Sequence, residues 1–427
     1  MKITIATFGS RGDTQPPLAL ALGLQQAGHS VTLVASRDLA GWIRSYGVNV
    51  FPMPLSAQEF MRKPEIAAML KSRNILFQLR TIRQVMDTLV GGVLDITLRA
   101  AQEADFLVLP ITECGGTDIA GRRGIPMAHA SFSPMFPPTR AFPSFFLPFR
   151  PSLGGRFNYM TYSLFMRVAW PVFGGSFNRW RMSRFNLPPW RSMREMFDSR
   201  RRFGTPWLFA YSPQALPKPA DWEDFHHVTG YWFLDAPPEW KPPPELAHFI
   251  ESGPPPVYIG FGSMSDKDPE RQTRMTLRAL ELTRQRGVLS TGWGGFARMD
   301  TSANVFYMDD VPHHWLFPRM AAVVHHGGAG TTGAGFRAGV PSLIAPFAGD
   351  QQAWAERAAK LGVGPRMKDA KSLTAEGLAA AIEAAVNDPG LRSRAASLGE
   401  KIRSENGVAR AVEVIERHAD AFNRRFR

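Results

Sequence analysis

Residues 323–332 read Val-Val-His-His-Gly-Gly-Ala-Gly-Thr-Thr, and residues 348–351, one strand later, read Ala-Gly-Asp-Gln. The pattern predicts a hydrophobic strand that breaks into glycines and then a helix start, followed by a second strand at 340–345. Glycines let a ligand approach the backbone closely, and the N–H groups at a helix start attract anions. His325 adds a polar group at the same point, so the stretch is typical of an anion site.

The polar pair Asp350 and Gln351 extends this interpretation. Carboxylate and amide groups supply the acceptors and donors that suit sugar hydroxyls. A phosphate site beside groups that can hydrogen-bond sugar hydroxyls predicts a nucleotide-sugar as ligand.

Length and cysteine content limit the classes of protein to which the chain can belong. The chain has 427 residues, more than one hydrophobic core usually serves, so two domains are expected. Its one cysteine, Cys114, excludes an internal disulfide and favours the reducing cytoplasm. Residues 1–8 lack the apolar segment of a signal peptide, because Gly9-Ser10-Arg11 interrupts it. No apolar run reaches the ~18 residues that span a bilayer, so a cytoplasmic protein is expected.

The charge balance favours anionic partners. Fifty Lys and Arg residues stand against 37 Asp and Glu residues, a formal net charge of +13. Arginines mix with aromatic residues at 179–185, and three follow one another at 200–202. This composition fits either a solvated basic face or peripheral contact with anionic lipid headgroups at the inner face of a membrane. No nucleic-acid-binding module accompanies the charge, so no nucleic-acid partner is expected.

The two halves of the chain follow the same plan. A strand at 2–8, a turn at 9–13, a helix at 16–27 and a strand at 30–35 form a βαβ unit, which implies a parallel sheet. A later buried strand is expected at 106–110. The second half begins a new sheet at 256–261, with Gly262 and Ser263 at the strand end, and continues with helices and strands in alternation.

Proline and composition mark the domain boundaries. The Pro-rich stretch around 235–244 is typical of a semi-rigid linker. We therefore expect an α/β fold of two Rossmann-like β/α/β domains facing across a cleft. The expected parts are an acceptor-binding domain at 1–235, a linker at 236–256, a nucleotide-sugar-binding domain at 257–405 and, at 406–427, a C-terminal helix that packs back on the first domain.

The segment 131–190 is unusually rich in Phe, Pro, Met and Trp. Its prolines exclude a regular helix, so we expect the aromatic residues on irregular loops. They form either a small core covered by loops or a wide apolar pocket for an acceptor molecule. The candidates for such a pocket are Phe132, Met135, Phe136, Phe142, Phe145 and Phe146.

The spacing from His325 to Gln351 resembles the donor-binding signature of the UDP-glycosyltransferase superfamily, whose fold is called GT-B. The versions at 9–13 (Gly-Ser-Arg-Gly-Asp) and 324–332 resemble its sterol 3β-glucosyltransferase branch and related bacterial enzymes without accessory lipid-binding domains. The match continues through 311–319. This resemblance implies the GT-B fold and the transfer of glucose from UDP-glucose to an acceptor hydroxyl, with inversion at the anomeric carbon.

The resemblance also implies roles for single residues. His325 would contact the diphosphate, with Ser263 nearby, and charge that builds on the departing UDP would be stabilised there. Asp350 and Gln351 would bind the sugar hydroxyls, while Trp293 and Val311 would lie near the uracil and ribose. The backbone N–H groups that would hold the diphosphate belong to Gly328, Ala329, Gly330, Thr331 and Thr332.

Asp13 is the candidate general base. It follows a glycine turn at the carboxyl end of a strand, where α/β folds place their ligands. A carboxylate there can take the proton of the acceptor hydroxyl as the new bond forms. The alternative is a purely structural role at the start of the following helix.

Three positions depart from the pattern of the family. Many members carry a glutamate for the ribose hydroxyls where this chain has Gly333, and an aromatic residue near the uracil where it has Asp310. Sterol-type enzymes often have His-Ile-Ala where residues 118–120 read Asp-Ile-Ala. The acceptor therefore stays open among sterols, triterpenoids and other lipids, with a phenolic or macrocyclic natural product as the alternative.

No cofactor or metal is expected. Asp309 and Asp310 are adjacent, and neighbouring side chains on a strand point to opposite faces. The chain offers no Cys/His cluster for zinc. A dinucleotide oxidoreductase is disfavoured, because the turn at 9–13 lacks Gly-x-Gly-x-x-Gly. A non-catalytic lipid-binding protein is the remaining alternative from another class.

Overall fold

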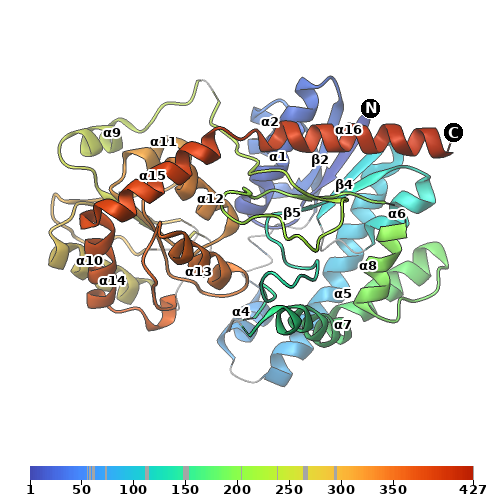
Figure 1. Ribbon diagram of the computed structural model, residues 1–427, viewed down its shortest axis with the longest axis horizontal. Coiled ribbons are helices and arrows are strands. Elements are labelled where there is room, and N and C mark those ends of the chain that lie inside the picture. The colour runs from blue at the N-terminus through green and yellow to red at the C-terminus, as the bar shows by residue number, and fades with distance from the viewer. Residues whose placement is uncertain are drawn as a thin grey trace.

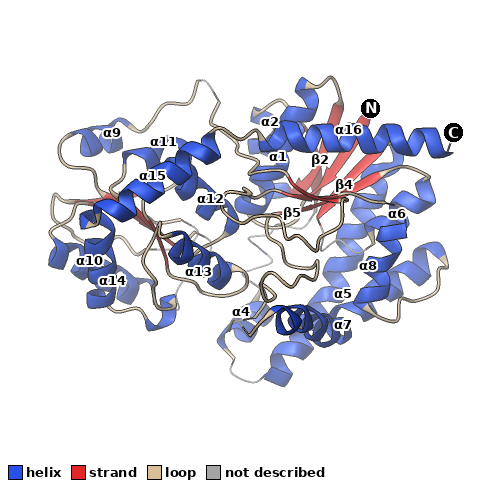
Figure 2. Ribbon diagram, in the orientation of Figure 1, coloured by secondary structure: helices blue, strands red, loops and turns tan. Residues whose placement is uncertain are grey.

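The computed structural model of the chain contains two parallel sheets, each flanked by helices (Figures 1 and 2). The residues that it describes are 1–54, 56, 59, 63–72, 75–110, 115–147, 153–202, 204–237, 239–262, 268–292 and 296–426. Within this part of the chain, no helix combines the length and the apolar character needed to cross a membrane.

The N-terminal sheet has seven parallel strands in the order β3-β2-β1-β4-β5-β6-β7. Its central strands are buried on both faces, which explains their nearly continuous apolar sequence. The strands are β1 (Lys2–Ala6), β2 (Ser30–Ser36), β3 (Asn49–Met53), β4 (Phe106–Pro110), β5 (Met127–Ser131), β6 (Trp207–Phe209) and β7 (His226–Val228). The helices of this half are α1 (Arg11–Gln26), α2 (Ala40–Ser45), α4 (Pro64–Lys71), α5 (Ile75–Ala100), α6 (Gly116–Arg123), α7 (Gly155–Phe185) and α8 (Met193–Arg202).

Helix α1 begins at Arg11, five residues before the predicted start at Pro16. The prediction placed Pro16 and Pro17 in the first turn of the helix, where proline is tolerated, but both lie further inside it. Pro17 has no N–H to offer the carbonyl of Asp13, four residues earlier. The Thr7 hydroxyl donates to that carbonyl instead, at 3.1 Å, so the helix continues through the prolines without an unpaired acceptor at Asp13.

Helix α7 shows that the prediction of irregular structure throughout 131–190 was wrong. This helix is 31 residues long and contains a single proline, Pro171. The other prolines of the segment precede or follow α7 in the sequence and so do not interrupt the helix. The six aromatic and methionine candidates for the acceptor pocket do lie outside helices and strands, between 132 and 146.

The C-terminal sheet has five parallel strands in the order β10-β9-β8-β11-β12. They are β8 (Val257–Gly260), β9 (Gly287–Ser290), β10 (Val305–Met308), β11 (Ala322–His325) and β12 (Ser342–Ile344). Its helices are α10 (Pro269–Thr283), α11 (His313–Leu316), α12 (Ala329–Ala338), α13 (Gln351–Leu361), α14 (Ala375–Asn387) and α15 (Pro389–Arg403). In both sheets the first five strands have the order third, second, first, fourth, fifth, which confirms the predicted pair of Rossmann-like α/β domains.

The segment between the sheets is partly regular. Helix α9 (Pro244–Glu251) lies within 236–256, where the sequence predicted only a linker. Proline at the start of a helix costs no hydrogen bond, so the Pro-rich run leads into the helix.

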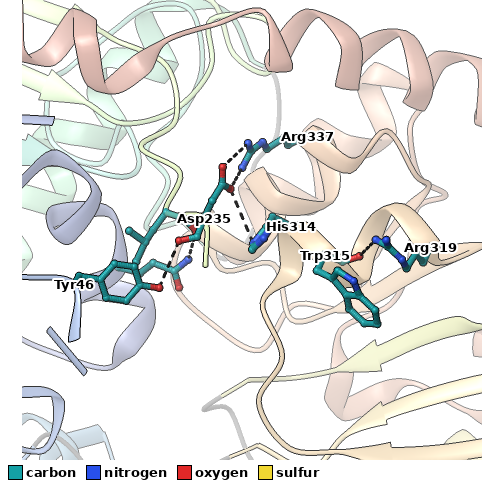
Figure 3. Close-up of polar contacts among 8 residues, drawn as sticks. Tyr46, Asp235, His314, Trp315, Arg319 and Arg337 are labelled. Atoms are coloured by element: carbon teal, nitrogen blue, oxygen red, sulfur yellow. Dashed lines mark hydrogen bonds and ion pairs between the residues drawn. The ribbon is translucent and has the colours of Figure 1, made fainter. Parts of the chain in front are cut away.

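Asp235, just before this segment, contacts the C-terminal half (Figure 3). Its carboxylate accepts hydrogen bonds of 2.6 and 3.2 Å from the Arg337 guanidinium on α12, and Nδ1 of His314 lies 4.0 Å away. Its carbonyl oxygen accepts a 3.5 Å bond from the Tyr46 hydroxyl of the N-terminal half, and Arg319 donates to the carbonyl of Trp315 nearby. Although partial burial acts to raise it, the Arg337 contact holds the pKa of Asp235 below its ordinary value.

The last helix, α16 (Gly407–Phe426), returns to the N-terminal domain and lies against α1 (Figure 1). Ala411, Ile415 and Ala419 are buried in one hydrophobic cluster with Leu24 of α1. His29 Nε2 and Glu416 Oε1, 3.0 Å apart, add a polar contact. The chain thus crosses twice between its halves.

Gly407 should be needed where α16 begins. A Cβ atom at this position would lie 2.4 Å from the Tyr231 carbonyl oxygen and 2.6 Å from the Gly230 carbonyl carbon, both backbone atoms. Gly407→Ala should therefore lower the free energy of unfolding by ~1–3 kcal/mol in urea titrations. Gly91→Ala is the matched control, because a Cβ there meets no atom within 4 Å, and it should be neutral or slightly stabilising. Equal stability of the two variants would contradict the observed docking of α16.

Candidate active site

The strand order reverses between β1 and β4 in the first sheet and between β8 and β11 in the second. Open α/β sheets bind ligands beyond the carboxyl ends of the strands at such a reversal. Asp13 follows β1, and His325 is the last residue of β11. The two main candidates from the sequence therefore lie at the favoured edge of each sheet.

A tight turn positions Asp13 in the first turn of α1. One carboxylate oxygen, Oδ2, accepts hydrogen bonds from the backbone N–H of Ser10 at 2.8 Å and from the Ser10 hydroxyl at 3.0 Å. Gly9 has a φ of +135°, and a Cβ there would lie 2.3 Å from that oxygen. Only glycine satisfies both conditions, so Gly9 and Ser10 fix the direction of the carboxylate.

The carboxyl group of Asp13 has a raised pKa. Asp13 is exposed as a residue, yet protein atoms crowd its carboxyl group, and this desolvation is the main cause. The hydrogen bonds from Ser10 act in the opposite direction, and the negative charge of Asp350 raises the pKa further. A carboxylate of raised pKa is a stronger base than an ordinary aspartate.

His325 is fully buried and its ring is oriented by the following turn. Its Nδ1 accepts a 3.1 Å hydrogen bond from the N–H of Gly327, and burial holds the pKa of the imidazole well below its ordinary value. A neutral ring whose Nδ1 is an acceptor carries its proton on Nε2. That atom is buried and has no hydrogen-bond partner among the described residues. His325 thus presents an unused donor.

The glycines beside it make room for the neighbouring ring of His326. A Cβ on Gly328 would lie 2.5 Å from Nε2 of His326, and one on Gly262, after β8, 3.0 Å from the same ring. Gly327 has a φ of +92°, and its Cβ would collide with Ile344 of β12. Gly327 and Gly328 are therefore required by the packing of this strand end.

Helix α12 points its first N–H groups out of the same turn, with Gly328 as the cap residue. Free N–H groups at a helix start form an anion site. The N–H of Thr332 is an exception among those predicted to bind the diphosphate, because it donates to the Gly328 carbonyl at 2.9 Å. The N–H groups of Ala329, Gly330 and Thr331 remain at the helix start, and the space in front of Gly330 is open.

Asp350 belongs to a polar network that crosses between the domains. Its Oδ2 accepts hydrogen bonds from the hydroxyl of Ser133, which follows β5 in the first domain, and from Trp354 Nε1 at 3.2 Å. Trp354 Nε1 also lies 3.2 Å from the Ser133 hydroxyl oxygen. Desolvation raises the pKa of Asp350, while these hydrogen bonds favour its charged form. The network holds Asp350 beside the loop that follows β5.

Gln351 contributes its side chain to the loop that precedes it. Its Oε1 accepts hydrogen bonds from the N–H groups of Phe347 and Ala348, at 2.8 and 3.1 Å. The acceptor half of the amide is thus used within the protein. Its NH₂ group makes no hydrogen bond to any described residue, so the donor half is the part available to a ligand.

Arg11 makes a second contact across the domain junction. Its guanidinium pairs with the carboxylate of Asp310, after β10, and lies 4.6 Å from the ring of Trp42. The nearby imidazole of His313 stacks on Phe317, and its burial, with the charge of Arg11, lowers its pKa to about 4. Asp310, a departure from the family pattern, therefore joins the two domains in this chain.

The candidate pocket residues pack largely among themselves. Phe136 and Phe145 are buried, Phe146 stacks on Phe165 with ring centroids 3.9 Å apart, and Phe145 meets Trp354 edge-on. Met135 and Phe142 pack partly buried against the same cluster, and Phe132 belongs to the core beneath α1. This packing is that of a small core covered by loops, the alternative to an open pocket.

A cavity of about 240 Å³ adjoins this cluster. Of the six candidates, only Phe136 lines it. The walls also include Tyr159 and Met166 of α7, Phe197 of α8 and Trp207 of β6. Charged side chains, among them Arg194, Asp198 and Asp221, line it as well, so it is a hollow of mixed aromatic and polar character within the N-terminal domain.

The remaining predicted residues are less informative. Val311 is buried in the core between Tyr258 and Phe317 and presents no side chain to a ligand. Ser263 and Trp293 lie outside the described residues. At Gly333, where relatives carry a glutamate, a Cβ would lie 2.6 Å from the ring of Tyr231, so packing excludes a side chain at this position.

The sequence did not reveal Ser133 and Trp354 as parts of the site. Trp354 lies four residues after Asp350, and this spacing on a helix predicts that the two side chains are neighbours. Ser133 has no comparable signal, since its partner is 217 residues away. Asp118, at the His-Ile-Ala position of sterol-type enzymes, pairs with the buried Arg181 and so has a structural role.

Two family models match the chain. Residues 3–106 match the glycosyltransferase family 28 N-terminal domain, and residues 298–417 match the C-terminal domain of the erythromycin biosynthesis protein CIII-like family. The two matches fall on the two sheets and include Asp13 and His325.

Sterol 3-beta-glucosyltransferases are among the similar curated proteins. The protein of Cryptococcus neoformans is 37% identical over 98% of this chain, which spans 27% of that protein. The protein of Emericella nidulans is 36% identical over 98% of this chain, which spans 30% of that protein. The protein of Arabidopsis thaliana is 34% identical over 98% of this chain and is covered to 68%. The chain thus spans less than a third of the fungal relatives and about two thirds of the plant relative.

Solved structures agree in fold. The calicheamicin glycosyltransferase CalG4 has a TM-score of 0.72 at 19% identity, with 98% of each chain covered. The glycotransferase of kitacinnamycin has a TM-score of 0.70 at 21% identity, with 98% of this chain and 99% of the other covered. From the family models, the plant relative and this shared architecture, the chain belongs to the GT-B glycosyltransferases, in the sterol 3-beta-glucosyltransferase-like branch of the UDP-glycosyltransferase superfamily.

Proposed function

We propose that the protein transfers glucose from UDP-glucose to a hydroxyl of a bulky apolar acceptor, a sterol, triterpenoid or other lipid, with inversion at the anomeric carbon. The observation that carries this proposal is the hydrogen bond from Ser133 to Asp350, which joins the predicted sugar-binding carboxylate of one domain to the domain that carries Asp13. Direct displacement needs the base and the bound sugar to be held at one place, and a site between the two domains would provide this. The names of the similar sterol 3-beta-glucosyltransferases support the sugar and the acceptor class.

The diphosphate of the donor would bind at the start of α12. The unused Nε2–H of His325 and the first N–H groups of the helix are donors fixed before any ligand arrives. Donors of this kind stabilise charge that develops on a leaving group, because they need little reorganisation. We expect them to replace a metal ion here, so transfer should persist in EDTA and need no cofactor.

The sugar would bind between Asp350 and Gln351. Asp350 keeps Oδ1 for a sugar hydroxyl, because the hydrogen bonds from Ser133 and Trp354 use Oδ2. Gln351 offers its NH₂ group. One acceptor and one donor, both held by other contacts, suit a vicinal pair of hydroxyls.

Asp13 would act as the general base. The acceptor oxygen attacks the anomeric carbon, the bond from that carbon to the UDP oxygen breaks, and the acceptor proton passes to the carboxylate of Asp13. Ser10 holds one carboxylate oxygen, which leaves Oδ1 for the proton. An anionic membrane surface belongs among the proposed partners of a cytoplasmic enzyme, because the chain carries a formal net charge of +13.

Transfer itself is tested with UDP-glucose and a panel of sterols, triterpenoids and phenols, with products detected by mass. A glycosylated sterol or triterpenoid is expected, and Asp13→Asn should lower turnover ~100-fold or more while UDP binding stays near that of the unmodified protein. A product formed only on phenols would show that the acceptor is a phenol and not a sterol or triterpenoid. Absence of any product together with absence of UDP-glucose binding would refute the proposal, and loss of UDP binding in Asp13→Asn would show a structural role.

The pH dependence of turnover should report the coupling of the two carboxylates. A base must be deprotonated, so turnover should fall as the pH drops through the raised pKa of Asp13. The Asp350 charge contributes to that raised pKa, so Asp350→Asn should move the acidic limb of the kcat profile to lower pH. Since Asp350→Asn is also expected to weaken sugar binding, kcat is measured at saturating donor. An acidic limb that stays in place would contradict the coupling.

His325 should donate from Nε2 and should not titrate near neutral pH. Nitrogen-detected NMR of the ligand-free protein should show the Nε2–H form throughout pH 5.5–8, because burial lowers the pKa of this ring. His325→Ala should weaken UDP binding ~10-fold or more by calorimetry, the effect of losing a hydrogen bond to a charged group. His29→Ala, near α16, is the control and should bind UDP normally. Unchanged affinity in His325→Ala would exclude the diphosphate role.

A further inference from the structure

Exposed apolar side chains concentrate on one helix. Six of the nine large hydrophobic residues that are exposed in the described part of the chain lie on α7 or just before it. They are Leu153, Tyr159, Met160, Leu164, Val168 and Met182. Scattered apolar residues are normal on protein surfaces, but a concentration on one element indicates a contact surface.

Three of these residues form a stripe. Met160, Leu164 and Val168 follow one another at intervals of four and therefore lie along one side of α7. Their exposed fractions are 53, 54 and 64%. Neighbouring positions such as Thr161, Tyr162 and Met166 are buried, so α7 packs on the domain with one side and shows this stripe on the other. We call Met160, Leu164 and Val168 the α7 stripe.

The charge along α7 has one sign. Its 31 residues include five arginines and no aspartate or glutamate. Arg181 and Arg184 are paired with Asp118 and Asp95 of neighbouring helices. Arg156 and Arg167 are exposed, and neither forms an ion pair with a described residue. They lie one turn from Met160 and Leu164, so positive charge without an ion-pair partner among the described residues borders the α7 stripe.

Further basic residues lie near the same edge of the domain. Helix α5 packs against both α7 and α4, and it carries the exposed Arg80 and Arg83. The exposed Arg140 contacts the start of α7, where its carbonyl accepts a 2.9 Å hydrogen bond from Asn158. Figure 1 shows α4 and α7 along the edge of the N-terminal domain opposite α16.

Resting on the proposed function and deepening it, we propose that the α7 stripe and its flanking arginines form the surface with which the protein docks on an anionic lipid bilayer. Apolar side chains enter the headgroup region while arginines at the border meet lipid phosphates. A second copy of the chain fits this surface less well, since it would bring two sets of exposed arginines together. A bilayer supplies both the apolar layer and the negative charge.

The cavity of the N-terminal domain adjoins the same helix as the α7 stripe. Tyr159, Ser163 and Met166, on the adjoining side of α7, line the hollow of the N-terminal domain, whose walls are partly aromatic and partly charged. Tyr159 is also 41% exposed, so it belongs to both the hollow and the outer surface. Docking through the α7 stripe would bring this hollow next to the lipid, where an apolar acceptor is dissolved.

Sedimentation with sucrose-loaded vesicles tests the surface. The full chain should bind vesicles of phosphatidylcholine and phosphatidylglycerol in equal parts, should bind pure phosphatidylcholine weakly, and should dissociate as salt shortens the range of the charges. Leu164→Glu should lower the partition coefficient about tenfold or more. Leu282→Glu is the matched control, an exposed leucine on α10 of the other domain, and should bind as the unmodified protein does. Thermal melts of both variants verify folding.

A second pair of variants separates local charge from net charge. Arg156→Gln/Arg167→Gln should lower partition about tenfold or more. Arg366→Gln/Arg392→Gln removes the same charge from exposed positions of the C-terminal domain. This variant should change the partition coefficient less than twofold. Equal loss in both pairs, or no vesicle binding at all, would overturn the proposal, as would a dimer by light scattering that Leu164→Glu dissociates.

Vesicle binding and donor binding are measured independently. Normal vesicle behaviour without UDP-glucose binding would refute only the proposed transfer. Normal UDP-glucose binding with no effect of Leu164→Glu on vesicles would refute only the docking surface.

Discussion

The hydrogen bond that Asp350 accepts from Ser133 joins the two domains at the point where chemistry is expected, and Trp354 of the second domain contacts both side chains. Ser133 follows a strand of the first sheet, and Asp350 follows a strand of the second. A carboxylate in this crowded setting keeps its charge only with donors in place, because desolvation favours the neutral form. The relative placement of the domains and the protonation of the site therefore depend on each other.

The same dependence extends to Asp13. Its pKa is raised by desolvation and further by the charge of Asp350, so any change that moves the domains apart weakens both effects. Arg11, two residues earlier in the same turn, pairs with Asp310 of the second domain. Asp235 and Arg337 make a further ion pair between the halves, at the linker (Figure 3). The basicity of Asp13 is thus a property of the assembled pair of domains.

Sequence reasoning succeeded where the signal is local. Gly327 and Gly328 at a strand end predict the close approach of a ligand to the backbone, which stays a prediction, and the structure shows in addition that Gly328 makes room for the ring of His326. The alternation of strands and helices sufficed for the fold class, because parallel sheets need crossover helices. For residues in contact across the domains, such as Ser133 and Asp350, neither periodicity nor spacing carries information, since the contact exists only after both domains have folded.

Proline in the segment 131–190 misled the prediction for a physical reason. A proline disrupts only its own turn, so its position within the segment decides more than its frequency does. Because Pro171 is the single proline within 155–185, a long helix forms and turns Met160, Leu164 and Val168 outward together. Irregular loops would have scattered these side chains. The continuous helix instead aligns apolar residues and exposed arginines along one edge, and this alignment distinguishes a docking surface from a merely apolar composition.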